Sequence, residues 1–167
     1  MSEIPFPYLQ NGSDRVALVE GHNSYNYSEV NSRINRFATG LLGDQEDLQE
    51  ERIAFFMPAS LDYVTTMHGV WRAGGITVPL NVASAVSELD HYLTCASVTR
   101  MIANAEYQDL LRELCDSLNI QLLSVEDVLA EEAGRLPEIA AERRAMILFT
   151  SGTTNKPKGV VSTHKTI

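Results

Sequence analysis

Hydroxyls, glycines and lysines are concentrated in one short run near the carboxyl end of this chain. The run from Leu148 to Val160 reads Leu-Phe-Thr-Ser-Gly-Thr-Thr-Asn-Lys-Pro-Lys-Gly-Val and continues an apolar segment that begins at Met146. Hydroxyls and backbone N–H groups donate hydrogen bonds to phosphate oxygens, lysine adds positive charge, and glycine lets the backbone approach a ligand. These residue types in this order predict a strand followed by a loop that binds the phosphates of a nucleotide.

The loop does not fit the Walker pattern, because Lys158 precedes Gly159 instead of following a glycine. It resembles the phosphate-binding signature of the adenylate-forming superfamily, Thr-Ser-Gly-[Ser/Thr]-Thr-Gly-x-Pro-Lys-Gly. The one departure is Asn155, in place of a glycine that could need positive φ, and asparagine is the usual substitute there. The alternative is an ordinary surface turn rich in small polar residues. The preceding apolar segment and the ordered Pro157-Lys158-Gly159 favour the phosphate loop.

Two earlier segments resemble the same family and occur in the family's order. The stretch Ser24–Val30 is similar to an early Thr-Tyr-x-Glu-Leu segment, and Trp71–Asn81 is similar to an Ala-Gly-x-x-x-x-Pro-Leu-[Asn/Asp] segment. The resemblance therefore covers nearly the whole chain. Within the second segment Trp71, Val78 and Leu80 are expected to pack in a core rather than to bind a ligand.

The resemblance assigns nucleotide binding to the loop and names no catalytic residue and no metal ligand in this chain. The loop hydroxyls would bind the β- and γ-phosphates, Gly152 would allow close approach, and Lys158 would supply charge. Lys156, at the variable position, is expected to face solvent. His164 is left out of the site because the sequence gives it no partner. The residues expected to bind the nucleotide are Thr150, Ser151, Gly152, Thr153, Thr154, Asn155, Lys156 and Lys158.

The resemblance implies an ATP-dependent acid–thiol ligase, an acyl-CoA synthetase. In that reaction a carboxylate attacks the α-phosphate of ATP, and an acyl-adenylate and pyrophosphate form. Mg²⁺ would arrive with the ATP, and coenzyme A is the expected second substrate, although a carrier protein could replace it. The stretch 160–164 is similar to malonyl-CoA-type synthetases, but this sequence does not identify the carboxylic acid.

Residues 1–167 are expected to form the amino-terminal part of the large adenylating domain, ending just after the phosphate loop. Later family segments, a Tyr-Gly-x-Thr-Glu run and a mobile domain with a catalytic lysine, have no counterpart here, so this fragment is not expected to turn over alone. The competing hypothesis is a truncated, non-catalytic module that binds a nucleotide or a partner. A generic nucleotide hydrolase is disfavoured, because no Walker lysine–serine pair is present.

Short apolar runs alternate with amphipathic segments along the chain. This pattern predicts an α/β fold, with a doubly wound, mainly parallel sheet, helices on both faces and a short antiparallel hairpin in front. Ligands bind such sheets at the carboxyl ends of the strands. Pro79 is expected at the end or edge of its strand. The hairpin is expected over residues 16–27, strands over 52–57, 76–80, 101–103, 121–123 and 146–149, and helices from Ser28, Ser60 and Ser87 and around Leu110.

Composition limits the class of protein. The net charge of −9 argues against a nucleic-acid surface and is assigned to solvated helices, including residues 44–51 and 126–132. No apolar run could span a bilayer and no signal segment is apparent, so a cytoplasmic protein is expected. Cys95 and Cys115 are expected to be buried and reduced. The histidines lack metal-ligand spacing, and the oligomeric state is left open.

Overall fold

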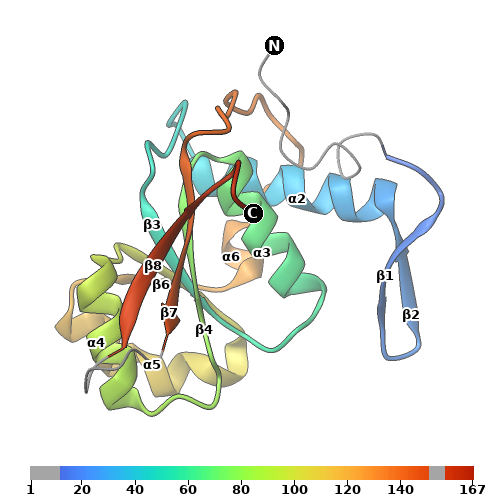
Figure 1. Cartoon of the computed structure of the whole chain (residues 1–167). Helices are drawn as coiled ribbons and strands as arrows, with labels where there is room; N and C mark the ends of the chain where they lie inside the picture. The colour runs from blue at the N-terminus through green and yellow to red at the C-terminus, as the bar shows by residue number, and fades with distance from the viewer. Residues whose placement is uncertain (1–11, 151–156) are drawn as a thin grey trace.

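Helices and strands alternate along the chain, as Figure 1 shows. The computed structural model describes residues 12–150 and 157–167. The elements are, in order, β1 (Val16–Glu20), β2 (Asn23–Asn26), α2 (Tyr27–Leu42), β3 (Arg52–Phe56), α3 (Leu61–Arg72), β4 (Ile76–Leu80), α4 (Val86–Ala96), β5 (Arg100–Ala103), α5 (Ala105–Ser117), β6 (Gln121–Leu123), α6 (Val125–Val128), β7 (Arg144–Thr150) and β8 (Lys158–Thr163).

Six strands form the main sheet, in the order β6-β5-β3-β4-β7-β8. All neighbouring pairs are parallel except the last, because β8 returns antiparallel to β7. β1 and β2 form a separate antiparallel hairpin that projects from the body near the start of α2 (Figure 1). The predicted fold class is therefore confirmed, and β8 is an addition that the sequence pattern does not predict.

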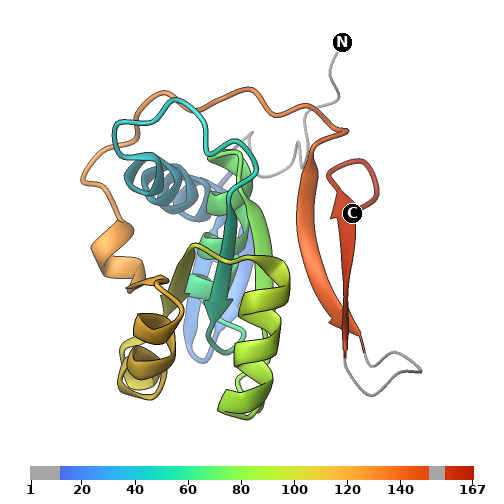
Figure 2. The ribbon, with the colours of Figure 1, turned by 90° about the vertical axis from the view of Figure 1, so that its left-hand side faces the viewer.

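Both faces of the sheet are buried at its centre, as the alternation of side chains along β3 shows. Ile53 and Phe55 belong to one apolar cluster, which α2, α3 and α6 cover. Ala54 and Phe56 belong to the other cluster, which α4 and α5 cover. Successive side chains of a strand point to opposite faces, so a strand between two helical layers is apolar at every position. In Figure 2 the β7–β8 hairpin lies along one side of the molecule, with α4 as a neighbouring helix.

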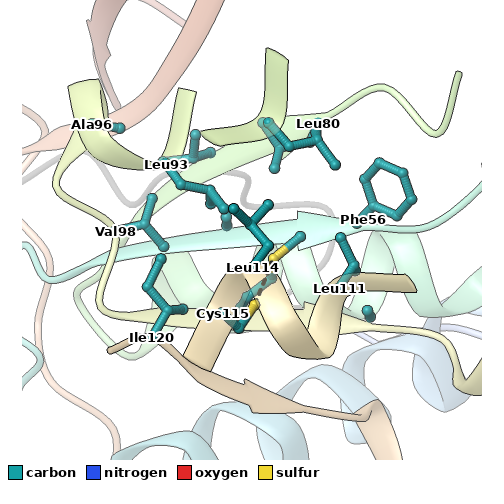
Figure 3. Close-up of a cluster of buried hydrophobic side chains, with 14 of the residues drawn as sticks. Phe56, Leu80, Leu93, Ala96, Val98, Leu111, Leu114, Cys115 and Ile120 are labelled. Atoms are coloured by element: carbon teal, nitrogen blue, oxygen red, sulfur yellow. Dashed lines mark hydrogen bonds between the residues drawn. The ribbon is translucent and has the colours of Figure 1, made fainter. Parts of the chain in front are cut away.

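The cluster beneath α4 and α5 also shows where the two cysteines lie. Cys115 is buried there among the residues drawn in Figure 3, with its Sγ 3.6 Å from the Met101 Sδ, and burial raises the pKa of its thiol to about 11. Cys95 is exposed, so the prediction that both cysteines are buried is wrong for Cys95. Leu93 and Ala96 point into the core, and Cys95 between them lies on the outer face of α4.

The starts of α2 and α3 follow the capping chemistry of their sequences. Ser60 caps α3 as predicted, since its Oγ accepts a hydrogen bond from the Tyr63 N–H at 3.1 Å. The cap of α2 is Asn26, and the prediction of Ser28 is wrong. Asn26 and Glu29 exchange two side-chain-to-backbone hydrogen bonds of 2.8 Å each, a capping box that starts the helix immediately after β2.

Pro79 is the penultimate residue of β4 and pairs with Phe55 of β3. The prediction that Pro79 lies near the end of its strand is therefore confirmed. The prediction of an edge strand is wrong, because β4 lies between β3 and β7. The Ile76 N–H points toward β3, where it donates to the Glu51 carbonyl. Backbone groups alternate in direction along a strand, so the position of Pro79 faces β7. The ladder between β4 and β7 joins Thr77 to Met146 and does not extend to Pro79, which therefore interrupts no β4–β7 ladder pairing.

The acidic stretch 44–51 is a turn, so the predicted helix there is wrong. Gln49 and Glu50 both have positive φ, at 52° and 64°, which no helix accommodates. The Asp47 carboxylate accepts a 2.7 Å hydrogen bond from the Gln49 N–H, and the Glu50 N–H donates to the Gly74 carbonyl. The second acidic stretch is helical only over α6.

Candidate functional site

The predicted phosphate loop connects β7 to β8, and the structure describes its two ends. Thr150 is the last residue of β7, Lys158 is the first residue of β8, and the two are paired across the hairpin. Both residues are exposed. The other expected site residues, Ser151, Gly152, Thr153, Thr154, Asn155 and Lys156, lie outside the described residues.

The ends of the loop lie at the carboxyl edge of the parallel strands. β7 runs parallel to β4, so Thr150 lies at the same edge as Phe56, Leu80 and Ala103, the last residues of β3, β4 and β5. Ligands bind open α/β sheets at this edge. The strand predicted to precede the loop is confirmed and extends from Arg144 to Thr150.

Two side chains of α4 contact both ends of the hairpin connection. The His91 Nε2 lies 3.0 Å from the Pro157 carbonyl oxygen, next to Lys158. The Tyr92 ring lies against the Phe149 ring, next to Thr150, with centroids 4.5 Å apart. α4 itself is fixed on the sheet by buried apolar residues, namely Leu89, Leu93 and Ala96. One helix therefore contacts the chain just before and just after the loop.

Gly159 makes room for this packing. It is paired with Phe149 across the hairpin. A Cβ at position 159 would lie 2.9 Å from the Ile147 Cγ2 and 3.5 Å from two carbons of the Phe149 ring. The absence of a side chain at Gly159 thus lets Ile147 and Phe149 keep their positions in the hairpin.

Lys158 carries a positive charge that no ion pair neutralises among the residues that the structure describes. Its exposed ammonium group and the exposed Thr150 hydroxyl are hydrogen-bond donors at paired positions. Charge-assisted hydrogen bonds to phosphate oxygens use donors of this kind. The two described ends of the loop therefore fit a phosphate group.

A buried tryptophan holds the amino end of β7. The Trp71 Nε1–H lies within hydrogen-bond distance of the Ala145 carbonyl oxygen, at 2.7 Å, and of the Thr77 Oγ1, at 3.1 Å. The Thr77 hydroxyl also donates to the Ala145 carbonyl at 3.1 Å. Trp71 was expected in the core and is 4% exposed. It is a core residue whose polar atom attaches β7 to α3 and β4.

Three ion pairs join the turn 47–51 to the amino ends of β7 and β5. They are Asp47 with Arg143, Glu50 with Arg144, and Glu51 with Arg100. Arg143 makes two hydrogen bonds to Asp47, of 2.5 and 2.9 Å, and a third to the Gly74 carbonyl at 2.6 Å. The Arg143 guanidinium holds the pKa of the Asp47 carboxyl below its usual value, and Arg144 does the same for Glu50. These carboxylates were expected to be simply solvated, and they instead stabilise the fold.

An open pocket of about 540 Å³ lies at this amino edge, lined in part by Glu50, Glu51 and Arg144. Within this pocket Glu50 is paired with Arg144, and Glu51 is paired with Arg100 at the start of β5. The pocket also lies at the edge of the sheet opposite to Thr150 and Lys158. We therefore assign the candidate site to the carboxyl edge.

His68 and His164 pack around Trp71. The His68 ring contacts the indole edge-to-face at 5.0 Å, and burial lowers the pKa of His68 to about 4, helped by the Arg72 charge. The His164 ring lies 5.9 Å from the indole and is buried, and burial lowers its pKa. His164 and His68 are therefore both buried side chains that pack on Trp71.

Within residues 12–150 and 157–167, no cluster of histidine, cysteine, aspartate or glutamate side chains could hold a metal ion. In the same part of the chain, no helix combines the length and the apolar character needed to cross a bilayer.

His91, Tyr92 and Gly159 are not among the site residues predicted from the sequence. His91 is separated from Pro157 by 66 positions, so no local spacing indicates their contact. The available signal was Gly159 itself, at a position opposite an aromatic residue in a hairpin. Gly159 lies opposite Phe149 only because residues 158–163 form β8. The alternation of apolar residues in the sequence does not predict this strand.

Known proteins share both the sequence pattern and the fold. The sequence profile of the AMP-binding enzyme family matches residues 8–167. The human mitochondrial malonate–CoA ligase ACSF3 is 33% identical over 167 residues, covering 92% of this chain and 29% of that protein. N-(5-amino-5-carboxypentanoyl)-L-cysteinyl-D-valine synthase of Streptomyces clavuligerus is 31% identical over 173 residues, covering 95% of this chain and 21% of that protein.

A solved structure gives the same fold at lower sequence identity. Apo MatB from Rhodopseudomonas palustris superimposes with a TM-score of 0.82 at 23% identity, covering 98% of this chain and 35% of that one. The chain thus spans about a third or less of the length of these proteins. It corresponds to the amino-terminal part of the malonate–CoA ligase and of MatB.

Proposed function

Because the chain belongs to the AMP-binding enzyme family, we propose that it forms the amino-terminal part of an ATP-dependent ligase that activates a carboxylic acid. The proposal rests on one observation. The family match includes the phosphate loop, and the described ends of that loop, Thr150 and Lys158, are paired at the carboxyl edge of the sheet. An exposed hydroxyl and an unneutralised ammonium group at that edge suit the polyphosphate of ATP.

In the proposed reaction the substrate carboxylate attacks the α-phosphate of ATP, and pyrophosphate leaves. Lys158 and the hydroxyls of Thr150, Ser151, Thr153 and Thr154 stabilise the negative charge on the leaving pyrophosphate. Electrostatic stabilisation of this kind dominates catalysis of phosphoryl-type displacements, because the protein contributes mainly positioning and charge and little covalent chemistry. Mg²⁺ supplies further positive charge when it binds with ATP.

We propose coenzyme A as the acceptor of the activated acid. The human relative is a malonate–CoA ligase, whereas the Streptomyces relative is a peptide synthase, so the family includes more than one acceptor class. Malonate is accordingly the first acid to test. The competing proposal, a non-catalytic module that binds a nucleotide or a partner, shares the fold but predicts no turnover in any context.

The test compares Lys158→Ala with Lys165→Ala, an exposed lysine in the turn after β8. The full-length protein is assayed for acid-dependent exchange of pyrophosphate into ATP, with malonate and a panel of other carboxylic acids. We expect Lys158→Ala to raise the KM for ATP about 10-fold, since a charge-assisted hydrogen bond contributes about 1.5–3 kcal/mol before solvent screening. Lys165→Ala should behave as wild type.

The outcomes separate the two proposals. Exchange that requires one acid, and that Lys158→Ala weakens through the KM for ATP, supports the ligase. Binding of Mg-ATP by calorimetry without exchange for any acid supports the non-catalytic module. Equal effects of the two lysine variants would contradict the role of Lys158 in either proposal.

A further inference from the structure

We propose that His91 and Tyr92 of α4 are positioning residues for ATP binding. They hold the two ends of the loop at a fixed separation, so that Thr150 and Lys158 face the same phosphate group. This proposal rests on the proposed function, and it adds residues that lie outside the loop. In Figure 1 the ends of β7 and β8 that flank the loop lie beside α4, in agreement with the His91–Pro157 contact.

The contact at the far end of the loop has a defined direction. A carbonyl oxygen accepts hydrogen bonds only, so the His91 Nε2 must carry a proton and donate to the Pro157 carbonyl at 3.0 Å. The ring of Pro157 fixes its own φ near −65°, which limits the movement of this carbonyl. His91 is half-buried, so the hydrogen bond is shielded in part from competing water. The position of Lys158, the next residue, follows from this contact.

The contact at the near end of the loop is apolar. Tyr92 and Phe149 are both half-buried, their ring centroids lie 4.5 Å apart, and both rings pack against the cluster beneath α4. The Phe149 ring also lies 6.3 Å from the His91 ring. Aromatic pairs at such distances stabilise one arrangement beyond the area that they bury. The position of Thr150, the residue after Phe149, is thereby tied to the same helix.

Because adjacent residues of one helix hold both ends, a movement of one end is coupled to the other. Pairing across the hairpin alone would allow the whole β7–β8 end to bend away from the sheet, since the ladder between β7 and β4 is confined to Thr77 and Met146. The contacts with α4 oppose that bending at the ends of the loop. Preorganised donors bind a ligand more tightly because no ordering is needed on binding.

The test uses His91→Ala, His91→Gln and, as a matched control, His22→Ala, an exposed histidine in the β1–β2 turn. In the full-length protein we expect His91→Ala to raise the KM for ATP about five-fold, with kcat changed less than two-fold, since one neutral hydrogen bond contributes about 1 kcal/mol. His91→Gln retains an N–H donor and should recover most of this loss. His22→Ala should leave both constants unchanged.

A second measurement judges the contacts without reference to activity. Nitrogen-15 NMR of the 167-residue chain should show His91 protonated at Nε2, and His91→Ala should shift the backbone amide of Lys158. An unprotonated Nε2 together with an unmoved Lys158 amide would overturn the proposal whether or not the protein is a ligase. A third outcome is a protonated His91 Nε2 and a shifted Lys158 amide in a protein that exchanges pyrophosphate into ATP with none of the acids. That outcome would refute the proposed function and support the contacts of α4 with the ends of the loop.

Tyr92 supplies the complementary test. Tyr92→Phe keeps the ring and should leave the KM for ATP within about two-fold of wild type, whereas Tyr92→Leu removes the aromatic pair and should raise it about three-fold. Equal KM values for Tyr92→Leu, His91→Ala and wild type, in variants that remain folded by circular dichroism, would overturn the positioning role. A KM unchanged for ATP with a KM raised for the acid would overturn it as well.

Discussion

The two ends of β7 are held by different chemistry. At the amino end, Arg143 and Arg144 pair with the carboxylates of Asp47 and Glu50, so charge is neutralised where the strand begins. At the carboxyl end, α4 holds the chain through one hydrogen bond and one aromatic pair, and Lys158 has no ion pair among the described residues. Charges at the first end stabilise the fold, and the charge at the second remains available to a ligand.

This difference shows how one hairpin, β7–β8, serves two purposes. A lysine that paired with a neighbouring carboxylate would have to lose that partner before it could bind phosphate. Attachment through neutral groups fixes the strand end without that loss. The acidic residues of this chain therefore include two different populations, and net charge alone does not distinguish the paired carboxylates from the solvated ones.

Loss of Arg143 should have the largest effect on stability. Arg143→Ala removes three hydrogen bonds and leaves the partly buried Asp47 carboxylate and Gly74 carbonyl without this partner. We expect the free energy of unfolding to fall by about 2–3 kcal/mol, measured by urea denaturation. The control is Arg135→Ala, an exposed arginine in the connection before β7, which should change stability by less than about 0.5 kcal/mol. A similar loss in both variants would mean that the ion pairs at the amino end contribute nothing specific.

Acid should weaken the amino end through His68, which packs on Trp71. The pKa of His68 is lowered from 6.5 to about 4 in the folded state, so between these values the unfolded chain takes up a proton that the folded chain does not. Stability contributed by neutral His68 is therefore present above pH 6.5 and is lost as the pH falls toward 4. From pH 7 to pH 5 we expect a loss of up to about 2 kcal/mol. His68→Gln should remove this part of the pH dependence, and an unchanged pH profile in that variant would contradict the assignment.

A methyl group at Gly159 should strain the carboxyl end. The added Cβ of Gly159→Ala would approach the Ile147 Cγ2 to 2.9 Å, and Ile147 is buried, so the hairpin must shift. We expect a loss of about 1–2 kcal/mol in the free energy of unfolding. Val161→Ala, at an exposed position of the same strand, should change stability by no more than about 0.5 kcal/mol. If the two variants were equally stable, the close packing of Phe149 and Ile147 over Gly159 would be of no consequence.

Local chemistry made much of the fold predictable. The unbroken apolar run of β3 indicated a strand buried on both faces, and the Ser60 cap indicated where α3 begins. Asn26 was missed because Ser28 is also a good capping residue, and the choice depended on the partner Glu29 and on where β2 ends. The helix predicted over residues 44–51 failed because acidic composition does not reveal that two residues adopt positive φ.

The loop was predictable in part because its residues are consecutive. The contacts at the two edges of the sheet were not, since Asp47 and Arg143, at the amino edge, are 96 positions apart and His91 and Pro157, at the carboxyl edge, are 66 positions apart. Such pairs come together only when the order of strands is known, and β7 enters the sheet beside β4 rather than beside β6, the strand that precedes it in sequence. Alternating helices and strands predict a parallel sheet without predicting that order.

Pro79 has a consequence for biosynthesis. Until the ribosome has produced β7, the side of β4 that β7 will cover is an open sheet edge, and it stays open for seconds at ordinary rates of elongation. Open edges recruit strands from other nascent chains and lead to aggregation. Pro79 places a missing N–H on that side, where it disrupts a continuous intermolecular ladder. We therefore expect Pro79 to disfavour such intermolecular pairing on the side of β4 where β7 later pairs.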